Sequence, residues 1–217
     1  KMHRNLLVGV LHLVVYLGFI IINIELLEIV IDGIFGTHRV LAFLGSTYDF
    51  AIAAFEWFAF AVIAAVLVFW FRRNIIHITR FRSAEMKGWP KLDANLILVI
   101  EVVLMLLFLT MNAADHALQL REEPHYPKAG LFPVSSALIP LFDSWSTANL
   151  ILVERSAWWA HILGILGFLN YLYYSKHLHI LLAFPNTFYA QLTPKGQFAS
   201  NEVVTREVKA MLSMQEP

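Results

Sequence analysis

The sequence contains no cysteine and has few charged residues. None of its 217 residues is Cys, which excludes disulfides, thiolate catalysis and iron–sulfur ligation by this chain. Charged residues make up 15% of the chain, against about 25% in soluble domains. Lys and Arg together balance Asp and Glu, so the formal net charge is zero. The chain therefore has no excess of positive charge with which to bind the phosphates of a nucleic acid.

Hydrophobic residues make up 59% of the chain, and they gather into long runs. We expect four of these runs to cross a membrane as helices, because each is long enough to span the hydrocarbon layer. The predicted spans are residues 6–31, 50–71, 96–118 and 157–184. Four prolines between residues 119 and 156 favour a loop there, with a short interfacial helix at 147–153. We predict an all-α integral membrane helical bundle over residues 1–185 and a tail over 186–217, which carries a short amphipathic helix at 200–214.

Basic residues concentrate between the second and third predicted spans. Cytoplasmic loops of membrane proteins carry an excess of Lys and Arg, so we expect this loop and both ends of the chain to be cytoplasmic. The loop's basic residues are Arg72, Arg73, Arg80, Arg82, Lys87 and Lys91.

The nine histidines are the obvious candidate metal ligands in a chain without cysteine. His161 and His179 lie 18 residues apart, which is five full turns of one helix, so both would point the same way about 27 Å apart. Gly164 and Gly167 between them would leave room for a flat group close to the backbone. Two histidines on one stripe at two depths predict axial ligation of stacked haem groups.

Each predicted haem needs either a second ligand or an open position on its iron. His12, in the first span, lies at the expected depth of His179 and is its natural partner. The partner of His161 is left open between His116 and His38, because both lie near the outer end of the bundle. The alternatives are that there is no second haem and that these histidines simply form hydrogen bonds within the bundle.

Two further residues are candidates for quinone binding or proton transfer. Glu56 lies inside the second span, where a carboxylate must be paired or protonated. It could handle protons near a quinone, or it could form a structural bond to Asn23, His38 or Asp49. His177 lies about 160° away from the stripe of His161 and His179, and it could serve a quinone site on the inner side or reach the membrane surface.

Two long stretches and two short ones carry a resemblance to a known family. The first long stretch runs from Leu11-His12-Leu13 to Gly36-Thr37-His38-Arg39, and the second from Glu154-Arg155 through Trp158-Trp159-Ala160-His161 and Ser175-Lys176-His177-Leu178-His179 to Thr187. The short ones are Lys87-Gly88-Trp89-Pro90 and Met111-Asn112-Ala113-Ala114-Asp115. Together they resemble the N-terminal membrane domain of bacterial iron–sulfur oxidoreductases related to heterodisulfide reductase, including the ETF:menaquinone oxidoreductase type. That domain is similar to the gamma subunit of respiratory nitrate reductase, and the resemblance extends to about Phe198.

The resemblance implies a haem b bundle that exchanges electrons between a cytoplasmic iron–sulfur module and menaquinone in the respiratory chain of a bacterial inner membrane. Electron-transfer flavoprotein is an implied partner. In the nitrate reductase subunit, two histidines of the last helix at the same 18-residue spacing bind two haems, and His161 and His179 match them. An earlier helix there carries two histidines ten residues apart. Only His12 matches, and the other position falls at Ile22, which leaves the second haem's ligand open.

Proteins of this family normally continue into cysteine-rich cluster domains, which this sequence does not contain. Since it starts at Lys1 rather than Met, we expect either a piece of a larger polypeptide or a membrane subunit whose cluster module is a separate chain. The alternative function is a haem-free membrane anchor or a proton-coupled transporter, in which the histidines and Glu56 serve assembly or transport. No inverted repeat relates the two halves, which speaks against the transporter.

Overall fold

The computed structural model describes residues 6–76, 87–192 and 201–213, and this part of the chain is helical without strands. The longer helices are α1 (Leu6–Phe35), α2 (Ser46–Asn74), α3 (Trp89–Leu120), α4 (Thr147–Leu172), α5 (His179–Phe188) and α6 (Glu202–Ser213). Short 3₁₀ turns are η2 (Val40–Leu44), η5 (Ser135–Phe142) and η6 (Lys176–Leu178). Helices α1 to α4 are long and apolar enough to cross a membrane, which confirms the predicted four-span helical architecture. Arg80 and Arg82 of the predicted basic loop lie outside the described residues.

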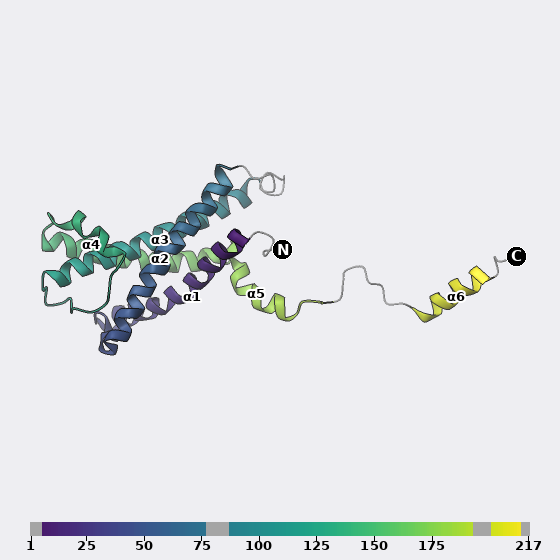
Figure 1. Cartoon of the computed structure of the whole chain (residues 1–217), viewed down its shortest axis with the longest axis horizontal. Helices are drawn as coiled ribbons and strands as arrows, with labels where there is room; N and C mark the ends of the chain where they lie inside the picture. The colour runs from purple at the N-terminus through teal and green to yellow at the C-terminus, as the bar shows by residue number, and fades with distance from the viewer. Residues whose placement is uncertain (1–5, 77–86, 193–200, 214–217) are drawn as a thin grey trace. The chain divides into compact units, whose positions relative to one another are not determined.

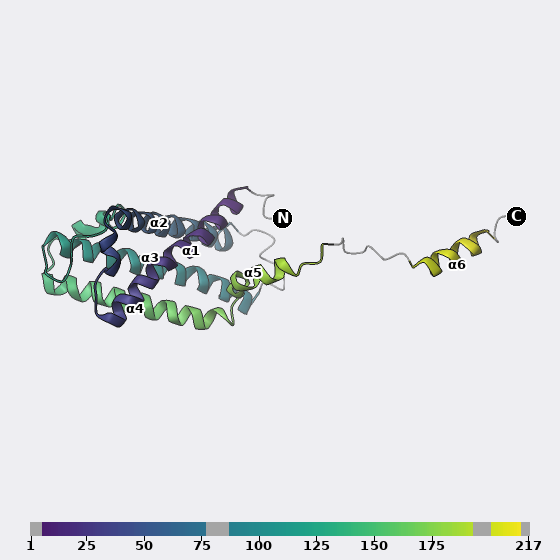
Figure 2. The same ribbon diagram turned by 90° about the horizontal axis from the view of Figure 1, so that it is seen from below.

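The described chain divides into two compact units, Lys1–Leu178 and His179–Pro217. Unit 1 contains the four long helices, and unit 2 contains α5 and α6. Within unit 1, α1 packs on α2, α2 on α3, and α3 on α4. Figure 2 shows α2, α3 and α4 side by side in this order, with α1 crossing them obliquely. The loop-rich end, which we define as residues 36–45 and 121–146, lies at one end of unit 1 (Figure 1).

The fourth span differs from the prediction at both ends. We expected residues 157–184, whereas α4 runs Thr147–Leu172 and the predicted interfacial helix forms its first turns. The side chain of Ser146 caps α4 by accepting a hydrogen bond from the Asn149 N–H at 3.3 Å. At the other end, Asp93 of α3 accepts the backbone N–H of Lys176 at 3.1 Å, and this tertiary bond replaces one that a continuing helix would make.

Because α4 ends at Leu172, His161 and His179 do not lie on one continuous helix as predicted. His161 lies on α4, whereas His179 begins α5 in the other unit. The two histidines are therefore not separated by five turns of one helix. The prediction that they share one face of a single helix was wrong. The fourth span was predicted to end at residue 184, yet the next residue, Pro185, lies inside α5.

Glycines set two helix boundaries. Gly36 (φ 67°) follows α1 in the left-handed conformation that commonly terminates helices. Gly88 (φ 68°) precedes α3, and Pro90 occupies its first turn, where a missing N–H costs nothing. The sequence had predicted the first span to end at residue 31 and the third to begin at residue 96, so α1 is four residues longer at its end and α3 seven residues longer at its start.

The predicted role of Gly164 as room for a flat ligand is also wrong. A Cβ atom at Gly164 would lie 2.7 Å from Leu104 Cδ2, so this glycine accommodates the side chain of Leu104. Gly18 of α1 serves the same purpose against α2, because a Cβ atom there would lie 2.5 Å from Val62 Cγ2. Gly167 of α4, by contrast, has no atom within 4 Å of the place where a Cβ would lie. The small residues therefore bring helices together, as they commonly do in membranes.

Candidate functional site

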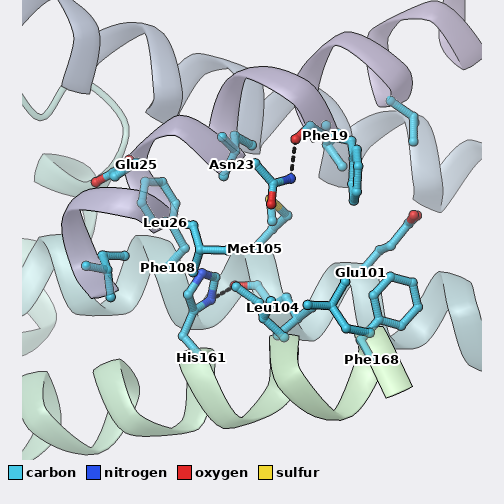
Figure 3. Close-up of a pocket in the computed structure, with 16 residues that line it drawn as sticks. Phe19, Asn23, Glu25, Leu26, Glu101, Leu104, Met105, Phe108, His161 and Phe168 are labelled. Carbon is cyan, nitrogen blue, oxygen red and sulfur yellow. Dashed lines mark hydrogen bonds between the residues drawn. The ribbon is translucent and has the colours of Figure 1, made fainter. Parts of the chain in front are cut away.

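A pocket lies inside unit 1 between α1, α3 and α4, with Val62 of α2 at its edge. Its cavity volume is about 80 Å³, which is well below the range of about 300–1,000 Å³ typical of small-molecule and cofactor sites. Its walls are mainly apolar, and four polar side chains reach it (Figure 3): Asn23, Glu25, Glu101 and His161.

His161 is the histidine among the described residues that line the pocket. Its side chain comes from α4 and is buried, with 2% of the residue exposed. The Nδ1 atom lies 3.0 Å from the backbone carbonyl oxygen of Leu104 on α3 (Figure 3). A carbonyl only accepts hydrogen bonds, so Nδ1 carries the proton and Nε2 of the neutral ring has a free lone pair. This is the arrangement typical of histidines that bind a metal through the second nitrogen.

Asn23 on α1 contributes a second hydrogen-bond acceptor. Its Nδ2 donates to the backbone carbonyl of Phe19, one turn earlier, which leaves the amide oxygen available on the pocket side (Figure 3). Asn23 and neutral His161 therefore both offer lone pairs. Such a pair suits an electron-pair acceptor such as iron, or a ligand with hydroxyl donors, better than it suits the carbonyl oxygens of an oxidised quinone.

Glu25 and Glu101 lie at opposite ends of the pocket (Figure 3). Glu101 pairs with His177 of η6, with 3.3 Å between Oε1 and Nε2. The His177 ring also packs edge-on against Phe168, which lines the pocket. His177 therefore reaches the pocket indirectly, through two of its lining residues.

A buried polar cluster connects the loop-rich end to the helices. Arg39 is its centre: its guanidinium binds Asp115 at 2.6 Å through Nε, Tyr48 at 2.9 Å and Asn112 at 3.2 Å. Burial lowers the pKa of Arg39, but Asp115 and the other partners of the guanidinium together raise it by more, so the guanidinium stays charged. Glu28 completes this side of the cluster by accepting the Tyr48 hydroxyl at 2.9 Å.

Glu56 is fully buried and anchors the loop-rich end to α2. Its carboxylate accepts the backbone N–H groups of Val134 at 2.8 Å and Ser135 at 3.1 Å. The Ser135 hydroxyl and the Asn112 amide donate to it as well. Four donors stabilise the ionised form of this carboxylate, and the contact to Asn112 links Glu56 to the Arg39 cluster.

The other predicted ligand histidines lie apart from His161. His38 binds Asp115 at 3.2 Å and packs edge-on against Tyr126. His116 lies 3.2 Å from the Ser136 hydroxyl and stacks on Phe132. His12 is exposed on α1, and none of these three is among the described lining residues of the pocket.

The predicted pairs are therefore not brought together in unit 1. His179 starts the other unit. The described residues contain no group of three or more His, Asp or Glu side chains that could hold a bare metal ion. A haem needs only one or two protein ligands, and His161 can supply one.

Sequence reasoning missed two of the central residues. Arg39 was named only within a stretch that carries the family resemblance, and Glu25 was not among the candidates. Glu25, Glu28 and Asp32 recur every three to four residues and so share one face of α1, next to a loop with one arginine. That spacing was the available signal for a buried acidic face. The Leu104 carbonyl that orients His161 had no such signal.

Comparison with known proteins gives one relative. The probable iron-sulfur-binding oxidoreductase FadF of Bacillus subtilis (strain 168) is 26% identical to the chain over 194 residues. The match covers 87% of this chain and 25% of the relative, so the chain spans about a quarter of that protein's length. No protein-family model matches the sequence. No solved structure is similar to it either.

Proposed function

We propose that this chain is the haem b membrane part of a quinone-reactive oxidoreductase, in which it passes electrons between an iron–sulfur module and the menaquinone pool. The observation that carries the proposal is the buried His161, whose Nδ1–H is held by the Leu104 carbonyl beside a largely apolar pocket. Similarity to an iron–sulfur-binding oxidoreductase supports an electron-transfer role. The chain has no cysteine, so the clusters would belong to a partner or to a further domain.

His161 would hold the haem iron through Nε2. A bound haem would supply one-electron transfer, with a potential that depends on its ligands and burial. The Leu104 carbonyl fixes the tautomer and the orientation of the imidazole, so the ligand is ready before binding. Phe108 and Phe168 belong to the apolar wall of the pocket.

The remaining ligand assignments are predictions. His12 and His179 stay the proposed pair for a second haem, and His38 or His116 the proposed second ligand of the His161 site. Of the two quinone or proton candidates, His177 is the better supported, because its partner Glu101 lines the pocket. Glu56 already accepts four hydrogen bonds, which supports a structural role instead.

We further propose a bacterial inner membrane location with both ends of the chain in the cytoplasm. The iron–sulfur module, or electron-transfer flavoprotein acting through it, would then approach from the side of the α2–α3 connection. Lys87 and Lys91 near the start of α3 support this orientation, because basic residues mark cytoplasmic loops.

Haem content tests the proposal directly. The full chain, purified with its native partner, should show a dithionite-reduced minus oxidised spectrum of b-type haem, and a pyridine haemochrome assay should give the haem-to-chain ratio. His161→Ala should lower that ratio by one. His125→Ala, an exposed histidine at the loop-rich end, is the matched control and should leave it unchanged. Wild-type protein without haem, or full haem content in His161→Ala, would contradict the assignment.

A haem-free membrane anchor or proton-coupled transporter is the second candidate. The observation that favours it is the buried Glu25, because buried acidic groups in membrane helices commonly serve proton movement. A haem-free wild-type preparation would favour this candidate.

A further inference from the structure

Glu25 differs from the other buried carboxylates of unit 1. It is 4% exposed, and its buried Oε2 atom has no hydrogen-bond partner among the residues that the structure describes. Glu28, by contrast, accepts bonds from Leu41 N–H and the Tyr48 hydroxyl, both at 2.9 Å. Asp115 is contacted by two guanidinium nitrogens of Arg39, Nε and Nη2. An ionised carboxylate without donors is costly to bury, whereas a protonated one is far less so.

The surrounding charges lead to the same conclusion. The charged groups that act on Glu25 are Arg39 of the loop-rich end, Glu28 on its own helix, Glu56 of α2 and Asp115 of α3. The three carboxylates are all stabilised in their ionised forms by donors. They already outnumber the single guanidinium, so a fourth negative charge at Glu25 would be opposed by repulsion.

Glu25 also joins two sites. It lines the pocket at the end opposite Glu101 (Figure 3), and it lies within the electrostatic reach of the Arg39 cluster. On α4, His161 faces the same pocket. Because Glu25 is buried, a change of charge inside the pocket acts on it more strongly than it would on an exposed carboxylate.

We propose that Glu25 is the proton-exchanging group of the pocket, held as a neutral carboxylic acid while the pocket carries no positive charge. When the pocket gains one positive charge, the O–H bond of Glu25 breaks and its proton passes to bulk water. When that charge is lost, one proton returns to the same oxygen. The protonation itself stands on the burial and charges around Glu25, but its link to electron transfer rests on the proposed function.

Infrared spectroscopy tests the protonation without any cofactor. Purified full-length chain in lipid nanodiscs should show the C=O band of a protonated carboxyl group at neutral pH, with a shift in D₂O. Glu25→Gln should lose this band. Glu122→Gln, an exposed glutamate that pairs with Lys128, is the control and should keep it. If Glu25→Gln does not fold, Glu25→Asp retains an acid and should shift the band. A band that is missing in the wild type, or unchanged in the Glu25 variants, overturns the proposal.

A second measurement tests the link to the pocket. In haem-containing protein, the midpoint potential should fall with rising pH, and Glu25→Gln should flatten this dependence while Glu122→Gln preserves it. An unchanged slope in Glu25→Gln overturns the coupling. A haem-free preparation that still shows the Glu25 band would reject the proposed function alone and leave the proton site standing.

Discussion

Arg39 and Asp115 form the closest ion pair of the buried cluster: Nε and Nη2 of the arginine lie 2.6 and 2.5 Å from the same oxygen, Oδ2. The partners are 76 residues apart in the chain. Their side chains are 8% and 2% exposed. The pair therefore fastens the loop between α1 and α2 to the end of α3.

Removing one partner of this pair should be costly. Arg39→Leu leaves Asp115 as a buried charge without its main donors, and we expect a loss of about 3–5 kcal/mol in unfolding free energy. Asp115→Asn should be less severe, because the amide oxygen can still accept from Arg39. Thermal unfolding in detergent or nanodiscs measures both variants.

A matched surface pair provides the control for this prediction. Lys128 and Glu122 form an ion pair of 2.7 Å whose side chains are 68% and 76% exposed. Lys128→Leu should have little effect, since exposed pairs contribute little to stability. Equal losses in Arg39→Leu and Lys128→Leu would show that burial of the Arg39 pair has no special role.

Gly18 should tolerate no side chain at the contact of α1 with α2. Its missing Cβ leaves room for the stiff side chain of Val62, so Gly18→Ala should destabilise unit 1 by about 1–3 kcal/mol through overpacking. Gly167→Ala, also inside a helix but in open space, should be neutral or gain up to about 1 kcal/mol. Thermal unfolding separates the two, and similar midpoints would contradict the packing role of Gly18.

The hydroxyl group of Tyr126 should contribute to the stability of unit 1. This group donates to Glu154 Oε2 at 3.0 Å, and Glu154 is 1% exposed. Burial and the Glu154 carboxylate raise the pKa of Tyr126, so it remains a donor at every physiological pH. Tyr126→Phe leaves a buried acceptor underbonded and should cost about 1–3 kcal/mol. Tyr174→Phe, at a ring that is 76% exposed, should change the unfolding temperature little.

His125 should make the loop-rich end sensitive to mild acid. Partial burial lowers its pKa below 6.5, and the nearby charges of Arg155 and His38 lower it further. The unfolded state therefore binds a proton more readily, so stability is complete above about pH 6.5 and falls as the pH drops below it. The effect should be small because the ring is exposed. Unfolding midpoints between pH 8 and pH 5 should fall less in His125→Gln than in the wild type; equal slopes would exclude His125 as the cause.

The candidate site was predictable in part. His161 could be found because a histidine inside an apolar run is costly and therefore functional by default. Its partner on α3, the Leu104 carbonyl, is a backbone group that every residue carries, so no residue type marks it. Glu56 was recognised as unusual, but its four donors come from residues 112, 134 and 135, which only the folded chain brings to it.

The sequence by itself determined the four membrane helices and the exclusion of cysteine chemistry, because hydropathy, length and composition are local properties. Only the tertiary structure decided where α4 ends, since Asp93 of α3 binds the Lys176 N–H beyond Leu172 and so separates His161 from the helix of His179. It also decided that Arg39 pairs with Asp115, whereas none of the described residues donates a hydrogen bond to Oε2 of Glu25. Buried polar groups choose partners across helices, and that choice depends on packing rather than on spacing along the chain.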